Sequence, residues 1–152
     1  MAERTAKPAL VSDPALADAR WFTDVLQNAG ALGDAVVTAV QQRRIGTGQT
    51  GHSVAFSLTY DKRAPDAPPT VVGKFPSQEP QSRAAAKTFG LYEREVRFYQ
   101  DIAETVDIRV PSCYFADIDL EPVTSCYCWR TFAPPFRVTR SPGAPSMMRC
   151  SR

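Results

Sequence analysis

The hydrophobic residues of the chain fall into short runs of different period, and these runs predict helices and strands. Between residues 13 and 30, apolar side chains recur three and four positions apart, which is the pattern of an amphipathic helix. Asp13 and Pro14 suit the start of this helix, and Gly30 suits its end. The apolar stripe consists of Leu16, Trp21, Phe22, Val25 and Leu26. We expect the helix to pack on the outside of the domain rather than to carry chemistry.

Four shorter runs have the pattern of β-strands. Residues 36–40 are rich in valine, and residues 53–60 alternate small or polar residues with apolar ones. A loop with three prolines comes next, and residues 70–75 form the third run. Residues 112–118 form the fourth.

A helix is expected between the third and fourth strands. Residues 83–103 are rich in helix-forming side chains, with an irregularity expected at Gly90. The order strand, hairpin, strand, helix, strand predicts an α+β fold. Three antiparallel strands carry the packed helix, and one more strand comes after it.

A glycine-rich turn joins the first two strands. Gly46, Gly48 and Gly51 match the spacing of a dinucleotide-binding fingerprint and nearly match a phosphate-binding P-loop. Both motifs must open a helix, but a strand comes next here, and His52 stands where the P-loop needs a lysine. A glycine turn between two strands, with Lys74 on the next strand, has the order of the nucleotide flap of kinases. A hairpin whose glycines serve only the turn is the alternative.

A carboxylate on the following helix is expected to pair with Lys74. Glu95 shares its helix face with apolar or aromatic residues, namely Leu91, Tyr92, Phe98, Tyr99 and Ile102. A carboxylate on such a face requires a cationic partner, and Lys74 is the one we expect. Glu93 lies on a mixed face, and the alternative is that both glutamates belong to an exposed Glu–Arg surface.

These motifs resemble those of a known family. The likeness rests on the glycine turn and strand at residues 46–60, Val-Val-Gly-Lys-Phe-Pro at 71–76, and Gly-Leu-Tyr-Glu-Arg-Glu-Val-Arg-Phe-Tyr at 90–99. They resemble the aminoglycoside-phosphotransferase and choline-kinase-like superfamily, in particular its bacterial branch similar to the ecdysteroid-kinase-like (CHK kinase-like) proteins. The likeness extends from about residue 16 to residue 119. It covers only the N-terminal, protein-kinase-like lobe of that family.

The resemblance implies a function for the glycine turn and for the ion pair. It implies that the nucleotide flap consists of Gly46, Thr47, Gly48, Gln49, Thr50 and Gly51. By the same likeness, Lys74 binds the α- and β-phosphates of ATP, and Glu95 is its partner on the helix. The intact family uses ATP with Mg²⁺ to phosphorylate a hydroxyl group of a small-molecule acceptor. The expected partners are therefore a nucleotide and that acceptor.

Composition narrows the class of protein. A chain of 152 residues predicts one domain, and its net charge of +2 gives no indication of nucleic-acid binding. Because the chain has no long apolar run and no signal-peptide pattern, we expect a cytoplasmic protein without a membrane partner. The four cysteines lack the paired spacing of a zinc site, and His52 is the only histidine. We therefore expect no metal site.

The composition changes abruptly near residue 121. Residues 1–121 contain 13 basic and all 16 acidic residues, whereas residues 122–152 contain five arginines and no acidic residue. The second stretch also has five prolines and neither leucine nor isoleucine, so it lacks what a core needs. We expect residues 1–12 to be loose, residues 13–121 to form the lobe, and residues 122–152 to be disordered. Proteolysis would then leave a core that ends near Asp119.

The genetic code suggests an origin for this stretch. Cys126-Tyr127-Cys128-Trp129 must be encoded TGY-TAY-TGY-TGG. One nucleotide out of step, the same bases read YTA-YTG-YTG, which encodes three leucines. The flanking codons allow a shifted frame that resembles the fifth strand and hinge of the kinase family. We interpret residues 122–152 as the product of a frameshift near Glu121.

The catalytic machinery of the family is expected to be missing. Phosphoryl transfer needs an aspartate beside the acceptor hydroxyl and acidic or amide ligands for Mg²⁺. The chain has no histidine after His52 and no acidic residue after Glu121, so we assign no catalytic residue. The leading hypothesis is an inactive fragment of a small-molecule phosphotransferase. The alternatives are a non-catalytic nucleotide-binding or interaction module and an unrelated α+β domain.

Overall fold

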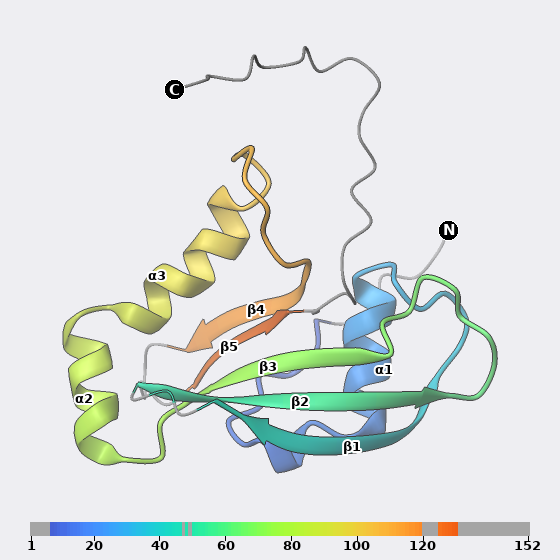
Figure 1. Cartoon of the computed structure of the whole chain (residues 1–152), viewed down its shortest axis with the longest axis horizontal. Helices are drawn as coiled ribbons and strands as arrows, with labels where there is room; N and C mark the ends of the chain where they lie inside the picture. Colours follow the sequence, from blue (N-terminus) through green and yellow to red (C-terminus); the bar gives the residue numbers. More distant parts are fainter. Residues whose placement is uncertain (1–6, 47, 49, 120–124, 131–152) are drawn as a thin grey trace, which may run out of the picture.

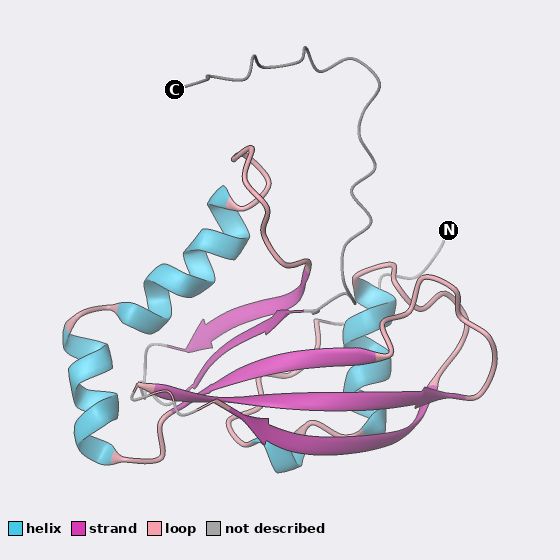
Figure 2. Cartoon of the chain, in the orientation of Figure 1, coloured by secondary structure: helices cyan, strands magenta, loops and turns pink. Residues whose placement is uncertain are grey.

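A computed structural model describes residues 7–46, 48, 50–119 and 125–130 of the chain. These residues form an α+β fold, in which helices pack against one antiparallel sheet (Figures 1 and 2). In chain order the elements are a 3₁₀ turn (Pro14–Leu16), α1 (Ala19–Asn28), β1 (Val37–Ile45), β2 (Gly51–Tyr60), β3 (Thr70–Pro76), α2 (Pro80–Thr88), α3 (Leu91–Arg97), a π-helical turn (Phe98–Ile102), β4 (Cys113–Asp119) and β5 (Ser125–Arg130).

The expected N-terminal helix is divided into two parts. Asp13 caps only the short 3₁₀ turn, where its carboxylate accepts a hydrogen bond of 2.8 Å from the amide of Ala15. Asp18 then caps α1 by accepting from the amide of Trp21, also at 2.8 Å. Because the 3₁₀ turn ends before α1 begins, Leu16 is not on the α1 stripe and stays 58% exposed.

The five strands lie in the order β1-β2-β3-β5-β4, and every neighbouring pair is antiparallel (Figure 1). The predicted antiparallel pairing of the first three strands is confirmed. β1 is longer than expected and continues to Ile45, directly before the glycine turn. The fourth predicted strand, β4, does not lie beside β3, because β5 lies between them.

β5 corrects one expectation about the end of the chain. The stretch from residue 122 was expected to be disordered, yet Ser125–Arg130 pairs with β3 on one side and β4 on the other. A strand is held by backbone hydrogen bonds, so an open place between two strands accepts many sequences, and tyrosine and tryptophan favour strands. The other residues of 122–152 lie outside the described part of the chain.

The single helix expected at residues 83–103 is three segments. α2 begins earlier, at Pro80, in the first turn where a proline is tolerated. Gly90 has a φ of +61°, in the left-handed region that glycine adopts readily, and the chain changes direction there before α3. The expected irregularity at Gly90 is thus a complete break between two helices.

Two hydrophobic clusters lie on opposite faces of the sheet. On one face, α1 covers the sheet, with the ring of Phe22 5.0 Å from Phe56 and that of Trp21 5.4 Å from Phe115. On the other face, α2 and α3 contribute a smaller cluster of Ala86, Tyr92 and Val96, against Ala116 and Ile118 of β4. The expected helix on the sheet is therefore α3, and it lies mainly beside β4 and β5 rather than over the first three strands.

Candidate functional site: the glycine turn and an ion pair

The turn between β1 and β2 requires glycine for two physical reasons. Gly46 has a φ of +75°, a conformation that costs other residues free energy. A Cβ atom on Gly48 would lie 2.4 Å from the carbonyl oxygen of Gly51, and one on Gly51 would lie 2.6 Å from that of Phe75. The turn is therefore built from close backbone approaches. Thr47 and Gln49, which were expected to belong to the flap, lie outside the described residues.

Lys74 lies in the middle of β3, opposite Ser53 of β2. Its neighbours Gly73 and Phe75 point to the α1 face, so Lys74 points to the face on which α3 packs. The register supports this placement, because Lys74 and Ala116 both pair with Cys128, on the two sides of β5. Residues directly opposite one another in neighbouring strands share a face of the sheet.

Lys74 and Glu95 form the predicted ion pair. The Nζ atom of Lys74 lies 2.6 Å from Oε2 of Glu95, whose side chain is 18% exposed. Glu93, the other candidate, pairs instead with Arg97 at 2.8 Å on the solvent side of α3. The sequence prediction of Glu95 rather than Glu93 as the partner of Lys74 is confirmed. Since the side chain of Lys74 is 40% exposed, the pair contributes little to folding stability, and its main effect is to fix the ammonium group.

The register identifies further residues beside Lys74 that the sequence analysis did not assign to the site. Ile45, Ser53 and Lys74 form one row across β1, β2 and β3. Val72 lies in the next row, two residues before Lys74, on the same face. These side chains make a small, mostly apolar platform next to the ammonium group. The alternation of residues 53–60 indicated two faces, but only the observed register shows which residues of β1 and β3 join them.

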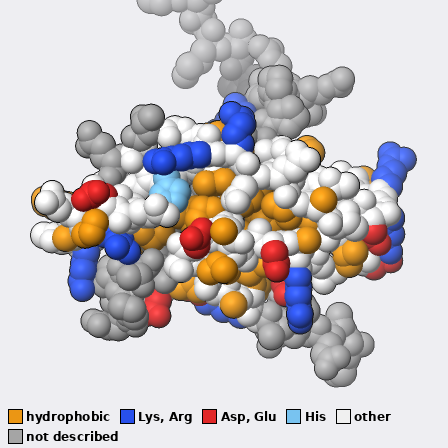
Figure 3. Space-filling view, turned by 90° about the horizontal axis from the view of Figure 1, so that it is seen from below, with side chains coloured by type: hydrophobic (Ala, Val, Ile, Leu, Met, Phe, Trp, Pro, Cys, Tyr) orange, Lys and Arg blue, Asp and Glu red, His pale blue; other side chains and the backbone are white. Residues whose placement is uncertain are grey.

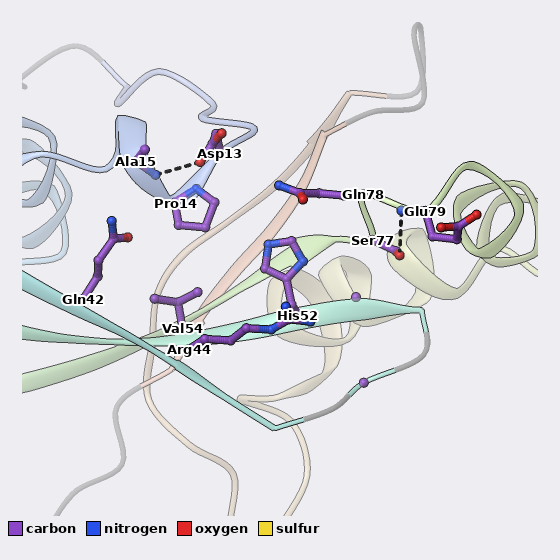
Figure 4. A pocket seen from close by; sticks show the side chains of 12 residues that line it. Asp13, Pro14, Ala15, Gln42, Arg44, His52, Val54, Ser77, Gln78 and Glu79 are labelled. Atoms are coloured by element: carbon purple, nitrogen blue, oxygen red, sulfur yellow. Dashed lines mark hydrogen bonds between the residues drawn. The ribbon is translucent and has the colours of Figure 1, made fainter.

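A hollow of about 460 Å³ lies on the other side of the β1–β2 hairpin, between it, the 3₁₀ turn and the β3–α2 connection (Figure 4). Figure 4 shows the imidazole of His52 directed into it, near Gln78 and Pro14. The ring of His52 stacks on that of Phe75, with the centroids 5.9 Å apart. Burial, and then the guanidinium of Arg44, lower the pKa of His52, against a smaller opposite effect of Asp13. Because His52 and Ser53 point to opposite faces, this hollow is separate from the Lys74 site.

The charges on the surface are mixed. Figure 3 shows basic and acidic side chains interspersed around a central group of hydrophobic ones, on the face turned to the viewer. Within the described part of the chain, no three His, Cys, Asp or Glu side chains come together as a metal site. Across the same residues, none of the helices has both the length and the apolar character needed to cross a membrane.

The chain was compared with protein-family models, with curated proteins and with solved structures, and none of the three comparisons gives a match. The functional interpretation therefore rests on the residues and their geometry.

Proposed function

We propose that the chain is the phosphate-binding lobe of an ATP-dependent phosphotransferase that acts on a hydroxyl group of a small molecule. The observation that carries the proposal is the ion pair of Lys74 and Glu95, on a strand adjacent to the hairpin that bears the glycine turn. A turn with exposed backbone amides and a fixed ammonium group are complementary to the oxygen atoms of a polyphosphate.

The sheet order supports the same proposal. Lys74 has a strand on each side, with Ser53 of β2 opposite it on one side and Cys128 of β5 on the other. A lysine in a central strand is held more rigidly than one at an edge, and rigid placement favours recognition of a phosphate group. The apolar platform of Ile45 and Val72 offers a surface for the flat ring of a nucleotide base.

The chain by itself is proposed to bind phosphate without transferring it. ATP fits the glycine turn and Lys74, but the described residues provide no cluster of ligands for Mg²⁺. We therefore assign no step to the metal and no catalytic residue to this chain. Because residues 122–152 contain no acidic side chain, an aspartate that could accept the proton of an acceptor hydroxyl is missing from that stretch as well.

Titration of the ¹⁵N-labelled chain with ATP, tripolyphosphate and adenosine, monitored by NMR, tests the proposal. One charge-assisted contact contributes about 1.5–3 kcal/mol, which offsets only part of the cost of association, so we expect a dissociation constant on the order of millimolar or weaker. ATP and tripolyphosphate should shift the amide signals of Gly48, Gly51 and Lys74, whereas adenosine should not. Equal shifts with adenosine, or none with any of the three ligands, would contradict the proposal.

The alternative, a non-catalytic nucleotide-binding module, differs in the sequence that the gene encodes after residue 121. Sequencing the gene across the codon of Glu121 tests the frameshift interpretation directly. If the shift is real, a chain with the frame restored should hydrolyse or transfer phosphate from ATP, and Lys74→Ala should abolish this. A restored protein that binds ATP but phosphorylates no hydroxyl acceptor would favour the binding module.

A further inference from the structure

The hydroxyl group of Tyr92 connects α3 with the end of the glycine turn. It donates a hydrogen bond to the carbonyl oxygen of Thr50, which lies 42 residues earlier in the sequence. It also accepts a hydrogen bond of 3.3 Å from the amide of Ser77, the residue directly after β3. The amide of Ser77 is in turn 3.3 Å from the same carbonyl of Thr50. One buried hydroxyl group thus lies where the glycine turn, β3 and α3 meet.

The aromatic ring of Tyr92 is held firmly. Only 7% of the residue is exposed, and it packs with Ala86 and Val96 in the smaller hydrophobic cluster. A hydrogen-bonding group on such a ring has little freedom to move, and it is therefore suited to fix the group that it contacts.

Fixing the carbonyl of Thr50 also fixes the direction of the next amide. A peptide group is planar and trans, so the N–H of Gly51 points in the direction opposite to the C=O of Thr50. Gly51 is the last glycine of the turn, and a side chain there would collide with β3. The hydrogen bond from Tyr92 consequently determines the orientation of a peptide group at the position where phosphate oxygens would approach.

The same helix also holds the lysine. Tyr92 and Glu95 are three residues apart on α3, and residues with this spacing share a helix face. Tyr92 contacts the turn while Glu95 contacts Lys74 at 2.6 Å. A displacement of α3 would therefore disturb both phosphate-binding groups together.

We propose that Tyr92 is a positioning residue for nucleotide phosphates, because its hydroxyl group orients the Thr50–Gly51 peptide and couples that orientation to the Lys74–Glu95 pair. This inference rests on the function proposed above. Tyr92 itself contacts no ligand in this proposal, and it acts through the turn.

Tyr92→Phe keeps the ring and removes the hydroxyl group. Tyr60→Phe is a matched control, because the hydroxyl of Tyr60 also donates to a backbone carbonyl, that of Pro68 at 2.5 Å, but far from the glycine turn. Both variants lose one hydrogen bond and should have similar losses of stability in urea unfolding. We expect Tyr92→Phe to raise the dissociation constant for ATP about fivefold, the effect of one lost hydrogen bond, and Tyr60→Phe to leave it unchanged.

Two more readouts separate positioning from a purely structural role. In the free protein, Tyr92→Phe should shift the amide signal of Gly51 and speed its hydrogen exchange, and Tyr60→Phe should not. Combining Tyr92→Phe with Glu95→Gln should weaken ATP binding by less than the product of the two single effects, because both act through α3.

The outcomes distinguish this inference from the proposed function. If the wild-type chain shows no phosphate binding, the proposed function is wrong and the inference is overturned with it. If the wild-type chain binds ATP and Tyr92→Phe binds it equally well, only the inference is overturned. The same holds if Tyr60→Phe weakens binding as much as Tyr92→Phe.

Discussion

Lys74 and Glu95 are 21 residues apart in the sequence, and their charged groups lie 2.6 Å apart across β3 and α3. Two residues before Glu95, Glu93 pairs with Arg97 on the solvent side of the same helix. The two glutamates therefore have different structural roles although they are neighbours in sequence and identical in chemistry. This difference provides a matched pair for experiments on the site.

Lys74→Met should weaken the binding of ATP by about tenfold to a hundredfold, because it removes a charge-assisted contact of about 1.5–3 kcal/mol. Binding that starts near the millimolar range would then no longer be measurable by NMR titration. Glu95→Gln should have a smaller effect of severalfold, because the ammonium group remains but loses its orientation. In urea unfolding, each variant should change stability by less than about 1 kcal/mol, as is usual for a partly exposed pair.

Glu93→Gln is the control for this experiment. It removes the same charge from the same helix, so a general effect of net charge on ATP binding would be equal in Glu93→Gln and Glu95→Gln. We expect Glu93→Gln to bind ATP like the wild type. Equal losses in the two glutamine variants would contradict a specific role of the Lys74–Glu95 pair.

Much of this site could be predicted from local patterns. The spacing of Gly46, Gly48 and Gly51 indicates a tight turn, and helical periodicity is enough to select Glu95. Tyr92 was placed correctly on the apolar face, but its contact with Thr50 depends on tertiary packing between segments 42 residues apart. No local pattern carries that information.

The end of the sheet was harder to predict for a different reason. Composition describes what side chains can bury, and residues 122–152 are poor in the aliphatic residues of a core. β5 is nevertheless held between β3 and β4, and strand pairing uses backbone groups that every residue except proline can supply. Ser125–Arg130 contains no proline, which leaves its ladder complete.

Gly51→Ala should destabilise the β2–β3 pair. The new Cβ would lie 2.6 Å from the carbonyl oxygen of Phe75, a backbone atom that moves only with its strand. We expect a loss of roughly 1–3 kcal/mol in urea unfolding, the usual cost of overpacking, together with shifted amide signals for Phe75 and Lys74. Ser57→Ala, an exposed substitution on the same strand, should change stability by no more than about 0.5 kcal/mol. An unchanged Gly51→Ala variant would mean that β2 and β3 are less tightly paired than described.

His52 should make folding stability depend on pH in a narrow range. Burial first, and Arg44 second, lower its pKa in the folded chain below the ordinary value of 6.5. The unfolded chain therefore binds a proton more readily, and the contribution of His52 is complete above pH 6.5. It is lost as the pH falls from 6.5 through the lower pKa of the folded state.

NMR titration checks this directly, because the chain has a single histidine and its imidazole signals need no assignment. Arg44→Gln should raise the pKa of His52 towards 6.5 without restoring it fully, since burial is the larger cause. His52→Gln should remove this part of the pH dependence of stability. A measured pKa at or above 6.5 in the folded wild-type chain would contradict the described environment of the ring.

Removal of β5 should weaken both the fold and the site. β5 lies between β3 and β4, so a chain that ends at Asp119 leaves β4 without a neighbouring strand and turns β3 into an edge strand at Lys74. Each lost backbone hydrogen bond contributes about 0.5–1.5 kcal/mol, and several of them are a large share of the roughly 5–15 kcal/mol that stabilises a typical domain. We therefore compare residues 1–119 with residues 1–130, two chains that both lack residues 131–152. Residues 1–119 should unfold at a much lower urea concentration, and the NMR contacts between the rings of Trp21 and Phe115, which tie β4 to α1, should weaken or disappear. Binding of tripolyphosphate should also be lost, because Lys74 would no longer be held from both sides. Two chains of equal stability would instead support the expectation from composition that the folded part ends near Asp119.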